Sequence, residues 1–271
     1  MSYPIQTNEV VVATWYVDQR GNWGDDLNSW LINKLSGKLV RLVEPHAPRP
    51  KYVCIGSILH RCVRPDTVVW GAGMLSRNEQ FEPSATFLAV RGPITRQRIL
   101  ELGGTCPEIY GDPALLMPSL YAPPAPKQRF RLGIVPHYID KPLVDVANPE
   151  FRLIDICGST TDFIDQLVSC DAVISSSLHG VIAAQAYGIP AQWVQFSHKL
   201  AGDNSKFEDY FLSVGQTPQK PINMVEGECS ITDIEQVIQQ IPAPVIDIDL
   251  QALLDACPFF HGSVTSTPSA A

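Results

Sequence analysis

Apolar residues follow two alternating patterns along this chain, and the alternation predicts an α/β protein. Short runs rich in β-branched and aromatic residues are typical of buried strands, and in the first half they occupy 9–17, 51–56, 67–70 and 86–90. Between them, apolar residues recur at helical spacing, as in 27–35, and Pro93 opens a second predicted helix that reaches about Leu102. Strands that alternate with helices in this way favour a parallel sheet.

The same alternation restarts beyond a proline-rich segment. Four prolines lie within the twelve residues 118–129, a composition typical of stiff linkers. Further strands are predicted at 130–135, 151–156, 171–174 and 191–196, and helices at 161–170, 181–187, around 207–211, 232–241 and 249–257. We therefore predict two doubly wound, Rossmann-like domains that face each other across a cleft. Their predicted limits are 1–122, a linker at 123–129 and 130–262, with a disordered tail at 263–271.

One predicted strand end carries a dense group of reactive side chains. The strand 171–174 leads into three serines, 175–177, and then into His179 and Gly180, where a helix of small apolar residues begins. Ligands of parallel sheets bind at the carboxyl ends of strands, and the N–H groups of a helix N-terminus favour phosphate or carboxylate. An isolated serine–histidine turn is more often only a helix cap, so this motif alone does not establish a site.

Two further strand ends carry polar residues. The loop 19–28 contains two glycines and the pair Asp25 and Asp26, but it matches neither G-x-G-x-x-G nor a P-loop, so it predicts no dinucleotide or ATP site. A tight turn with a helix cap explains it as well as a ligand role does. Arg91 follows the strand 86–90 beside the helix that begins at Pro93, where it could hold an anion or form a surface ion pair.

Composition narrows the classes of function. The chain has 271 residues, of which 45% are hydrophobic, and a net charge of −8, which argues against a basic nucleic-acid-binding face. Seven cysteines without a C-x-x-C pair predict reduced thiols and no zinc site. We see no signal-peptide pattern and no apolar run near the ~18 residues of a membrane span, so we expect a cytoplasmic protein whose membrane contact, if any, is peripheral.

Taken together, seven short motifs resemble the polysaccharide pyruvyl transferase family. They occur in the family's order over roughly residues 10–215: GNWGDDLN at 21–28, WGAG at 70–73, VRGPIT at 90–95, GDPA at 111–114, PHY at 136–138, SSLHG at 176–180 and KFEDY at 206–210. The short length, and Ser177 where many members carry arginine, are most similar to the bacterial exopolysaccharide branch, such as xanthan ketal pyruvate transferase.

The resemblance implies a fold and a reaction. The fold is glycosyltransferase-B-like. The reaction is transfer of pyruvate from phosphoenolpyruvate to two hydroxyls of one sugar, as a cyclic ketal, with release of phosphate. The implied acceptor is a saccharide, often lipid-linked at the inner face of the cytoplasmic membrane. Phosphoenolpyruvate is the donor substrate, and neither a nucleotide, a further cofactor nor a metal is implied.

The resemblance also assigns roles to residues. His179 matches the catalytic histidine, Asp25 the acidic residue that faces the acceptor or assists as base, and Arg91 the donor-binding arginine. Ser176, Ser177 and Gly180 are expected to take phosphate oxygens, and the cation missing at Ser177 is expected from Lys206, Lys199 or His137. The acceptor side is expected at Asn22, Trp23 and Asp26, whereas Asp112, Asp209 and Trp70 are expected to be structural.

Two rival functions remain open from the sequence. A nucleotide-sugar glycosyltransferase could have the same fold, but it needs a nucleotide site for which no motif is visible in the C-terminal half. A non-catalytic member of a polysaccharide assembly system is the second rival. The presence of both His179 and Arg91 argues against it.

Overall fold

The computed structural model describes residues 9–17, 19, 21–225, 237–239, 241 and 243–260, which form two five-stranded sheets. Every pairing between the described strands is parallel. The first sheet has the order β2-β1-β3-β4-β5, built from β1 (Val10–Ala13), β2 (Leu39–Leu42), β3 (Lys51–Val53), β4 (Thr67–Trp70) and β5 (Thr86–Ala89). The second has the order β10-β9-β8-β6-β7, built from β6 (Leu132–Val135), β7 (Phe151–Leu153), β8 (Val173–Ser175), β9 (Ala191–Gln195) and β10 (Ile222–Asn223). The predicted α/β class with two parallel sheets is confirmed.

Two helices of the first half begin after the strands that the sequence indicated, and two short ones were not predicted. α1 (Trp23–Ser36) starts where the Asn22 side chain accepts the N–H of Gly24, and it ends at Gly37, whose φ of 66° is left-handed. The short α2 (Leu59–Cys62) follows β3, and α3 (Pro93–Glu101) starts at the predicted proline. A 3-10 turn, η1 (Pro113–Leu116), runs into α4 (Met117–Leu120).

The helices of the second half differ in how deeply they are buried. α5 (Thr160–Leu167) and α7 (Ser205–Ser213) are amphipathic, whereas α6 (Leu178–Ala186) is buried over most of its length. A Cβ on Gly180 would come within 2.3 Å of the Ser175 Oγ, so only glycine lets the first turn of α6 approach β8 this closely. A further 3-10 turn, η2 (Lys141–Leu143), follows β6.

The two halves share one hydrophobic core. α6 contacts η1, and α3 contacts α7, so helices of one half pack on elements of the other. Residues 121–129, which connect the sheets, contain neither helix nor strand. Among the described residues, no helix combines the length and the apolar character that crossing a bilayer requires.

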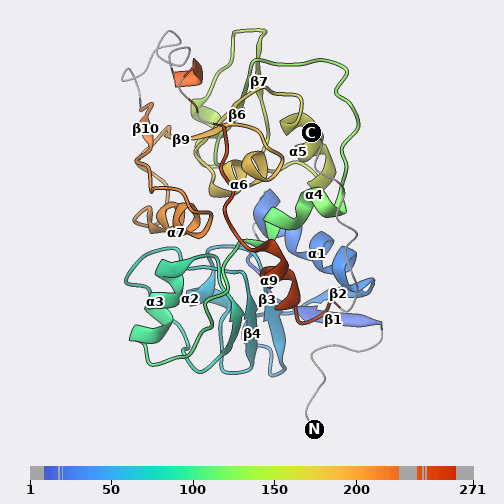
Figure 1. Cartoon of the computed structure of the whole chain (residues 1–271), viewed down its shortest axis with the longest axis vertical. Coiled ribbons are helices and arrows are strands. Elements are labelled where there is room, and N and C mark those ends of the chain that lie inside the picture. The colour runs from blue at the N-terminus through green and yellow to red at the C-terminus, as the bar shows by residue number, and fades with distance from the viewer. Residues whose placement is uncertain are drawn as a thin grey trace.

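The end of the chain returns to the first sheet, a crossing that the sequence did not indicate (Figure 1). α9 (Leu250–Asp255) confirms the helix predicted at 249–257. Its carbonyl at Leu253 accepts a 2.8 Å hydrogen bond from Trp70 Nε1, and Phe259 packs edge-on against the rings of Tyr52 and Trp70. The predicted helix at 232–241 lies mostly outside the described residues, of which 237–239 are helical, and the predicted tail at 263–271 lies wholly outside them.

Candidate active site

A cavity of about 140 Å³ lies between the two halves. Its lining follows the carboxyl ends of β1, β3, β6 and β8, the edge at which parallel sheets bind ligands. The first half contributes Tyr16, Asn22, Asp25, Ser57, Ile58, Arg61 and Leu75, and the second contributes His137, Ser177, Leu178, His179 and Lys206. Six of these lining residues are site residues predicted from the sequence, although they lie far apart along the chain: Asn22, Asp25, His137, Ser177, His179 and Lys206.

His179 lies in the first turn of α6 and contacts both halves. Its Nε2 is 3.4 Å from Asp112 Oδ2, an ion-pair separation when the imidazole is protonated, although the two atoms lack the geometry of a hydrogen bond. Asp112 is buried, and its other oxygen accepts the N–H of Ala114 at the start of η1. Asp112 was expected to be structural, and the start of η1 gives it such a contact, while its carboxylate also faces the candidate catalytic histidine.

Gly24 provides the space that the His179 ring occupies. A Cβ on Gly24 would come within 1.9 Å of Nδ1 and within 2.3 Å of two ring carbons. Asn22, two residues before Gly24, is the N-cap of the same helix. The beginnings of α1 and α6 thus meet at the imidazole, and only a glycine in the first turn of α1 allows this contact.

Asp25 is buried beside the histidine. Burial raises the pKa of its carboxyl to about 6, while the positive charge of His179 and a hydrogen bond from Asn22 oppose the shift. That hydrogen bond joins Asn22 Nδ2 to Asp25 Oδ2 at 2.9 Å. A carboxyl with a pKa near neutrality, next to an imidazole, is suited to proton transfer.

Two cations line the cavity. Burial and the nearby charge of Arg91 lower the pKa of Lys206 to about 8, and its Nζ lies 5.4 Å from the centre of the Phe207 ring. The Arg61 guanidinium lies 4.5 Å from the centre of the Tyr16 ring. Arg61, Tyr16 and Ser57 belong to none of the recognised motifs, and sequence reasoning missed them. Lys199, the third cation considered, is exposed and does not line the cavity.

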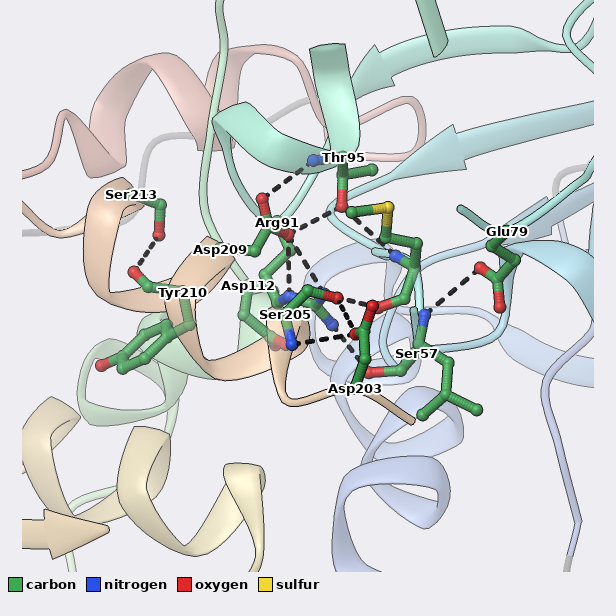
Figure 2. Close-up of polar contacts among 12 residues, drawn as sticks. Ser57, Glu79, Arg91, Thr95, Asp112, Asp203, Ser205, Asp209, Tyr210 and Ser213 are labelled. Carbon is green, nitrogen blue, oxygen red and sulfur yellow. Dashed lines mark hydrogen bonds and ion pairs between the residues drawn. The ribbon is translucent and has the colours of Figure 1, made fainter. Parts of the chain in front are cut away.

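Arg91 does not line the cavity, and Figure 2 shows its side chain among polar partners that include Asp209 and Ser57. Its guanidinium is 1% exposed and donates to Asp209 Oδ2 at 3.1 Å, to Ser57 Oγ at 2.7 Å and to the Met74 carbonyl at 2.7 Å. The Asp209 carboxylate also accepts from the backbone N–H and the hydroxyl of Thr95 in α3. The pair therefore joins α7 to the first half and orients Ser57, and direct binding of a donor by Arg91 stays a prediction.

Ser176 supports the cavity from behind. Its hydroxyl donates to Asp140 Oδ2 at 2.7 Å and accepts the backbone N–H of His137 at 2.9 Å. Asp140 is buried and also accepts from the Ser197 hydroxyl. This network fixes the loop that carries His137, so the structure gives Ser176 a positioning contact, and its predicted contact with phosphate stays a prediction.

Three further predicted residues lie beside the cavity rather than in its lining. Trp23 is fully buried against Phe163, and its Nε1 donates to the Thr160 carbonyl at 3.0 Å. Asp26 is exposed, and its carboxylate accepts the backbone N–H of Asn22 at 3.1 Å. Gly180 contributes close packing, as described above, and its backbone lies in the first turn of α6.

The described residues contain no group of three or more His, Cys, Asp or Glu side chains placed to hold a metal ion. The six cysteines within the described part of the chain are all free thiols. Burial raises the pKa of Cys54 well above its usual range and that of Cys62 to about 12. The described lining of the cavity offers carboxyl, imidazole, amine, guanidinium and hydroxyl groups.

Comparison with known proteins gives one family and two relatives. The sequence model of the family described as polysaccharide pyruvyl transferase matches residues 58–195. Uncharacterized protein L143 of Acanthamoeba polyphaga mimivirus is 29% identical over 259 residues, which cover 90% of this chain and 88% of that protein. Succinoglycan biosynthesis protein ExoV of Rhizobium meliloti (strain 1021) is 26% identical over 216 residues, which cover 75% of this chain and 65% of that protein.

Proposed function

Because this chain belongs to the polysaccharide pyruvyl transferase family, we propose that it moves pyruvate from phosphoenolpyruvate onto two hydroxyls of one sugar in an exopolysaccharide repeat unit. The products are a cyclic ketal and phosphate. The observation that carries the proposal is the cavity between the halves, which combines His179 and Asp25 with the cations Lys206 and Arg61. The similarity to a succinoglycan biosynthesis protein supports the class of acceptor.

The arrangement of the sheets supports a glycosyltransferase-B-like architecture for the same reaction. Two parallel sheets contribute their carboxyl ends to one cavity, so two substrates can enter from opposite halves. In this arrangement the acceptor lies against the N-terminal half and the donor against the C-terminal half, where Arg61 and Ser57 of the N-terminal half also reach it. We further propose that the protein acts in the cytoplasm, on an acceptor that is lipid-linked at the membrane surface, and requires no cofactor besides the donor.

The donor carries a phosphate and a carboxylate, and the cavity offers partners for both. Lys206 and Arg61 supply positive charge, and Ser177 precedes the free N–H groups at the start of α6. Ser57 receives its hydrogen bond from Arg91, which leaves the hydroxyl proton of Ser57 to donate to an anion. Arg91 thus serves the donor through Ser57, and His137 completes the wall on the side of the second sheet.

The reaction needs one proton on carbon and the removal of two protons from hydroxyls. The first sugar hydroxyl adds to C2 of phosphoenolpyruvate while C3 gains a proton and becomes a methyl group. The bond from C2 to the phosphate oxygen then breaks, its electron pair leaves with phosphate, and the second hydroxyl closes the ketal at C2. One hydroxyl proton balances the proton gained at C3, and the other leaves with phosphate.

The two proton-transfer groups have distinct roles in this scheme. We assign delivery of the proton at C3 to His179, because it is the imidazole beside Asp25 in the cavity lining and imidazoles serve as general acids. We assign removal of the hydroxyl proton to Asp25, because a carboxyl with a pKa of about 6 is mostly ionised at neutral pH and still basic enough to accept a proton. Asn22 holds the Asp25 carboxylate in place.

A thermal-shift experiment tests the choice of donor. Phosphoenolpyruvate should raise the melting temperature, because a ligand that binds only the native state stabilises it by mass action. UDP- and GDP-sugars should leave the melting temperature unchanged. Lys206→Met should abolish the shift, whereas the exposed Lys199→Met should retain it. A shift with a nucleotide sugar and none with phosphoenolpyruvate would favour the glycosyltransferase alternative.

A further inference from the structure

An open groove lies along α1 next to the candidate active site. Its volume is about 630 Å³, and it is bounded by α1, by β2 and by the loop that leads into α5. The helix contributes Asp26, Ser29, Trp30 and Asn33. In Figure 1, α1 lies between the layer that contains β2 and the second half of the molecule.

The spacing of these residues connects the groove with the active-site cavity. Positions 26, 29, 30 and 33 follow the i, i+3, i+4, i+7 spacing of an α-helix, so they share one face of α1. Asn22, one turn earlier on this face, lines the cavity and donates its backbone N–H to the Asp26 carboxylate at 3.1 Å. With a rise of about 1.5 Å per residue, Trp30 lies roughly 12 Å beyond Asn22. One continuous face of the helix therefore leads out of the cavity.

The side chains on this face suit a hydroxyl-rich ligand. Trp30 is half-buried and held edge-on by Tyr121, which leaves part of an apolar indole surface in the groove. Asp26 and Asn33 are exposed and offer carboxylate and amide groups. The Asn33 amide donates to the Lys38 carbonyl at 2.8 Å, so its carbonyl oxygen stays available as an acceptor.

The charges near the groove favour an uncharged ligand. The carboxylate of Asp26 lines the groove, and the ammonium group of Lys34, which is not part of the lining, lies 5.3 Å from the centre of the Trp30 ring. The two charges oppose each other in sign. Hydroxyls of Ser159 and Thr160 complete the opposite wall. An apolar ring, paired hydrogen-bonding groups and little net charge are the features that recognise a neutral sugar.

We propose that this groove binds the neutral sugar units that flank the pyruvylated residue in the acceptor chain. The inference rests on the proposed function, since it names where the rest of the acceptor lies once one sugar occupies the cavity. The groove then acts as a distal acceptor subsite, which selects an oligosaccharide over an isolated sugar. It contributes to binding and takes no part in proton transfer.

Two acceptors and two variants test the subsite. The acceptors are a neutral, depyruvylated oligosaccharide repeat unit of the producer's exopolysaccharide and the methyl glycoside of the sugar that bears the diol. Trp30→Ala should raise KM for the oligosaccharide about tenfold, because an aromatic contact of this kind has that order of effect. It should leave kcat/KM for the methyl glycoside unchanged. Asn33→Ala should act in the same direction, whereas Gln97→Ala, which removes an exposed amide from α3, should change neither acceptor.

A direct titration separates failure of the subsite from failure of the proposed function. The full chain, without phosphoenolpyruvate, is titrated calorimetrically with the oligosaccharide, and melting temperatures verify that each variant is folded. Binding that is weakened by Trp30→Ala and Asn33→Ala supports the groove even if no turnover occurs, in which case only the reaction is wrong. Equal binding by all variants, or an equal effect of Trp30→Ala on both acceptors, would overturn the subsite.

Discussion

Adding a single methyl group at Gly24 tests whether the position of His179 determines catalysis. Gly24 is in the first turn of α1, and its missing side chain makes room for the imidazole. In Gly24→Ala the new Cβ would lie 1.9 Å from Nδ1, where an ordinary contact begins at 3.4 Å. The ring must therefore retreat by about 1.5 Å, which also changes its distance from Asp112.

The expected magnitude follows from this displacement. A misplacement of about 1 Å in a catalytic group costs ~10²-fold in rate, so kcat should fall at least that far. Overpacking of this kind destabilises by typically 1–3 kcal/mol, which partly cancels against the better helix propensity of alanine, up to ~1 kcal/mol. A protein of ordinary stability, about 5–15 kcal/mol, stays folded after a net loss of this size, so the fall in kcat should occur in folded protein.

The assay combines turnover with thermal unfolding. Phosphate release from phosphoenolpyruvate and the oligosaccharide acceptor gives kcat, and melting temperatures are compared for His179→Ala with and without Gly24→Ala. Once the imidazole is removed, the added methyl group has space, so the double variant should melt at or above the temperature of His179→Ala alone. If Gly24→Ala retains wild-type kcat, or if it destabilises the His179→Ala background as much as the wild type, the contact does not control catalysis and the reasoning is refuted.

Three further predictions concern buried charges. Asp25→Asn should stabilise the protein by up to about 3 kcal/mol at pH 7. Folding raises the pKa of Asp25 from 3.8 to about 6, so the wild-type native state loses stability as the pH rises through 6. Urea unfolding should show the gain from the substitution vanish near pH 4, and a gain that grows at low pH would contradict the direction of the pKa shift. Asp209→Ala should destabilise by about 3–5 kcal/mol, since it leaves the charge of Arg91 buried without its partner, and a loss below 1 kcal/mol in the same assay would show that the pair is unimportant. Affinity for phosphoenolpyruvate, measured calorimetrically, should fall as the pH rises through about 8, where Lys206 loses its proton. Lys206→Arg should remove that pH dependence. A wild-type affinity that is flat from pH 7 to 9 would exclude Lys206 as the cation that binds the donor.

Local sequence patterns predicted the parts of the fold that depend on neighbouring residues. The hydrophobic runs became strands, Pro93 opened α3, and Gly37 ended α1 in a left-handed conformation that glycine adopts readily. Six of the predicted site residues also converged on one cavity, because the carboxyl ends of parallel strands meet at one edge of each sheet.

Contacts between distant segments could not be predicted from the sequence alone. Arg91 and Asp209 are 118 positions apart, and their pairing depends on how α7 docks on α3. Asp112 reaches His179 only because η1 packs on α6. Arg61 carries no motif, and only the placement of α2 at the end of β3 brings it to the cavity. In each case tertiary packing, and not a local pattern, selected the partner.

The most direct test of the central claim follows the proton that reaches the donor carbon. The protein is incubated in deuterium oxide with phosphoenolpyruvate and the oligosaccharide acceptor, and the product is analysed by mass spectrometry and NMR. The account predicts one equivalent of phosphate and a cyclic pyruvate ketal whose methyl group carries one solvent-derived deuterium. A product without a ketal, or a ketal whose methyl group carries no deuterium, would contradict protonation at C3 and with it the proposed transfer from phosphoenolpyruvate.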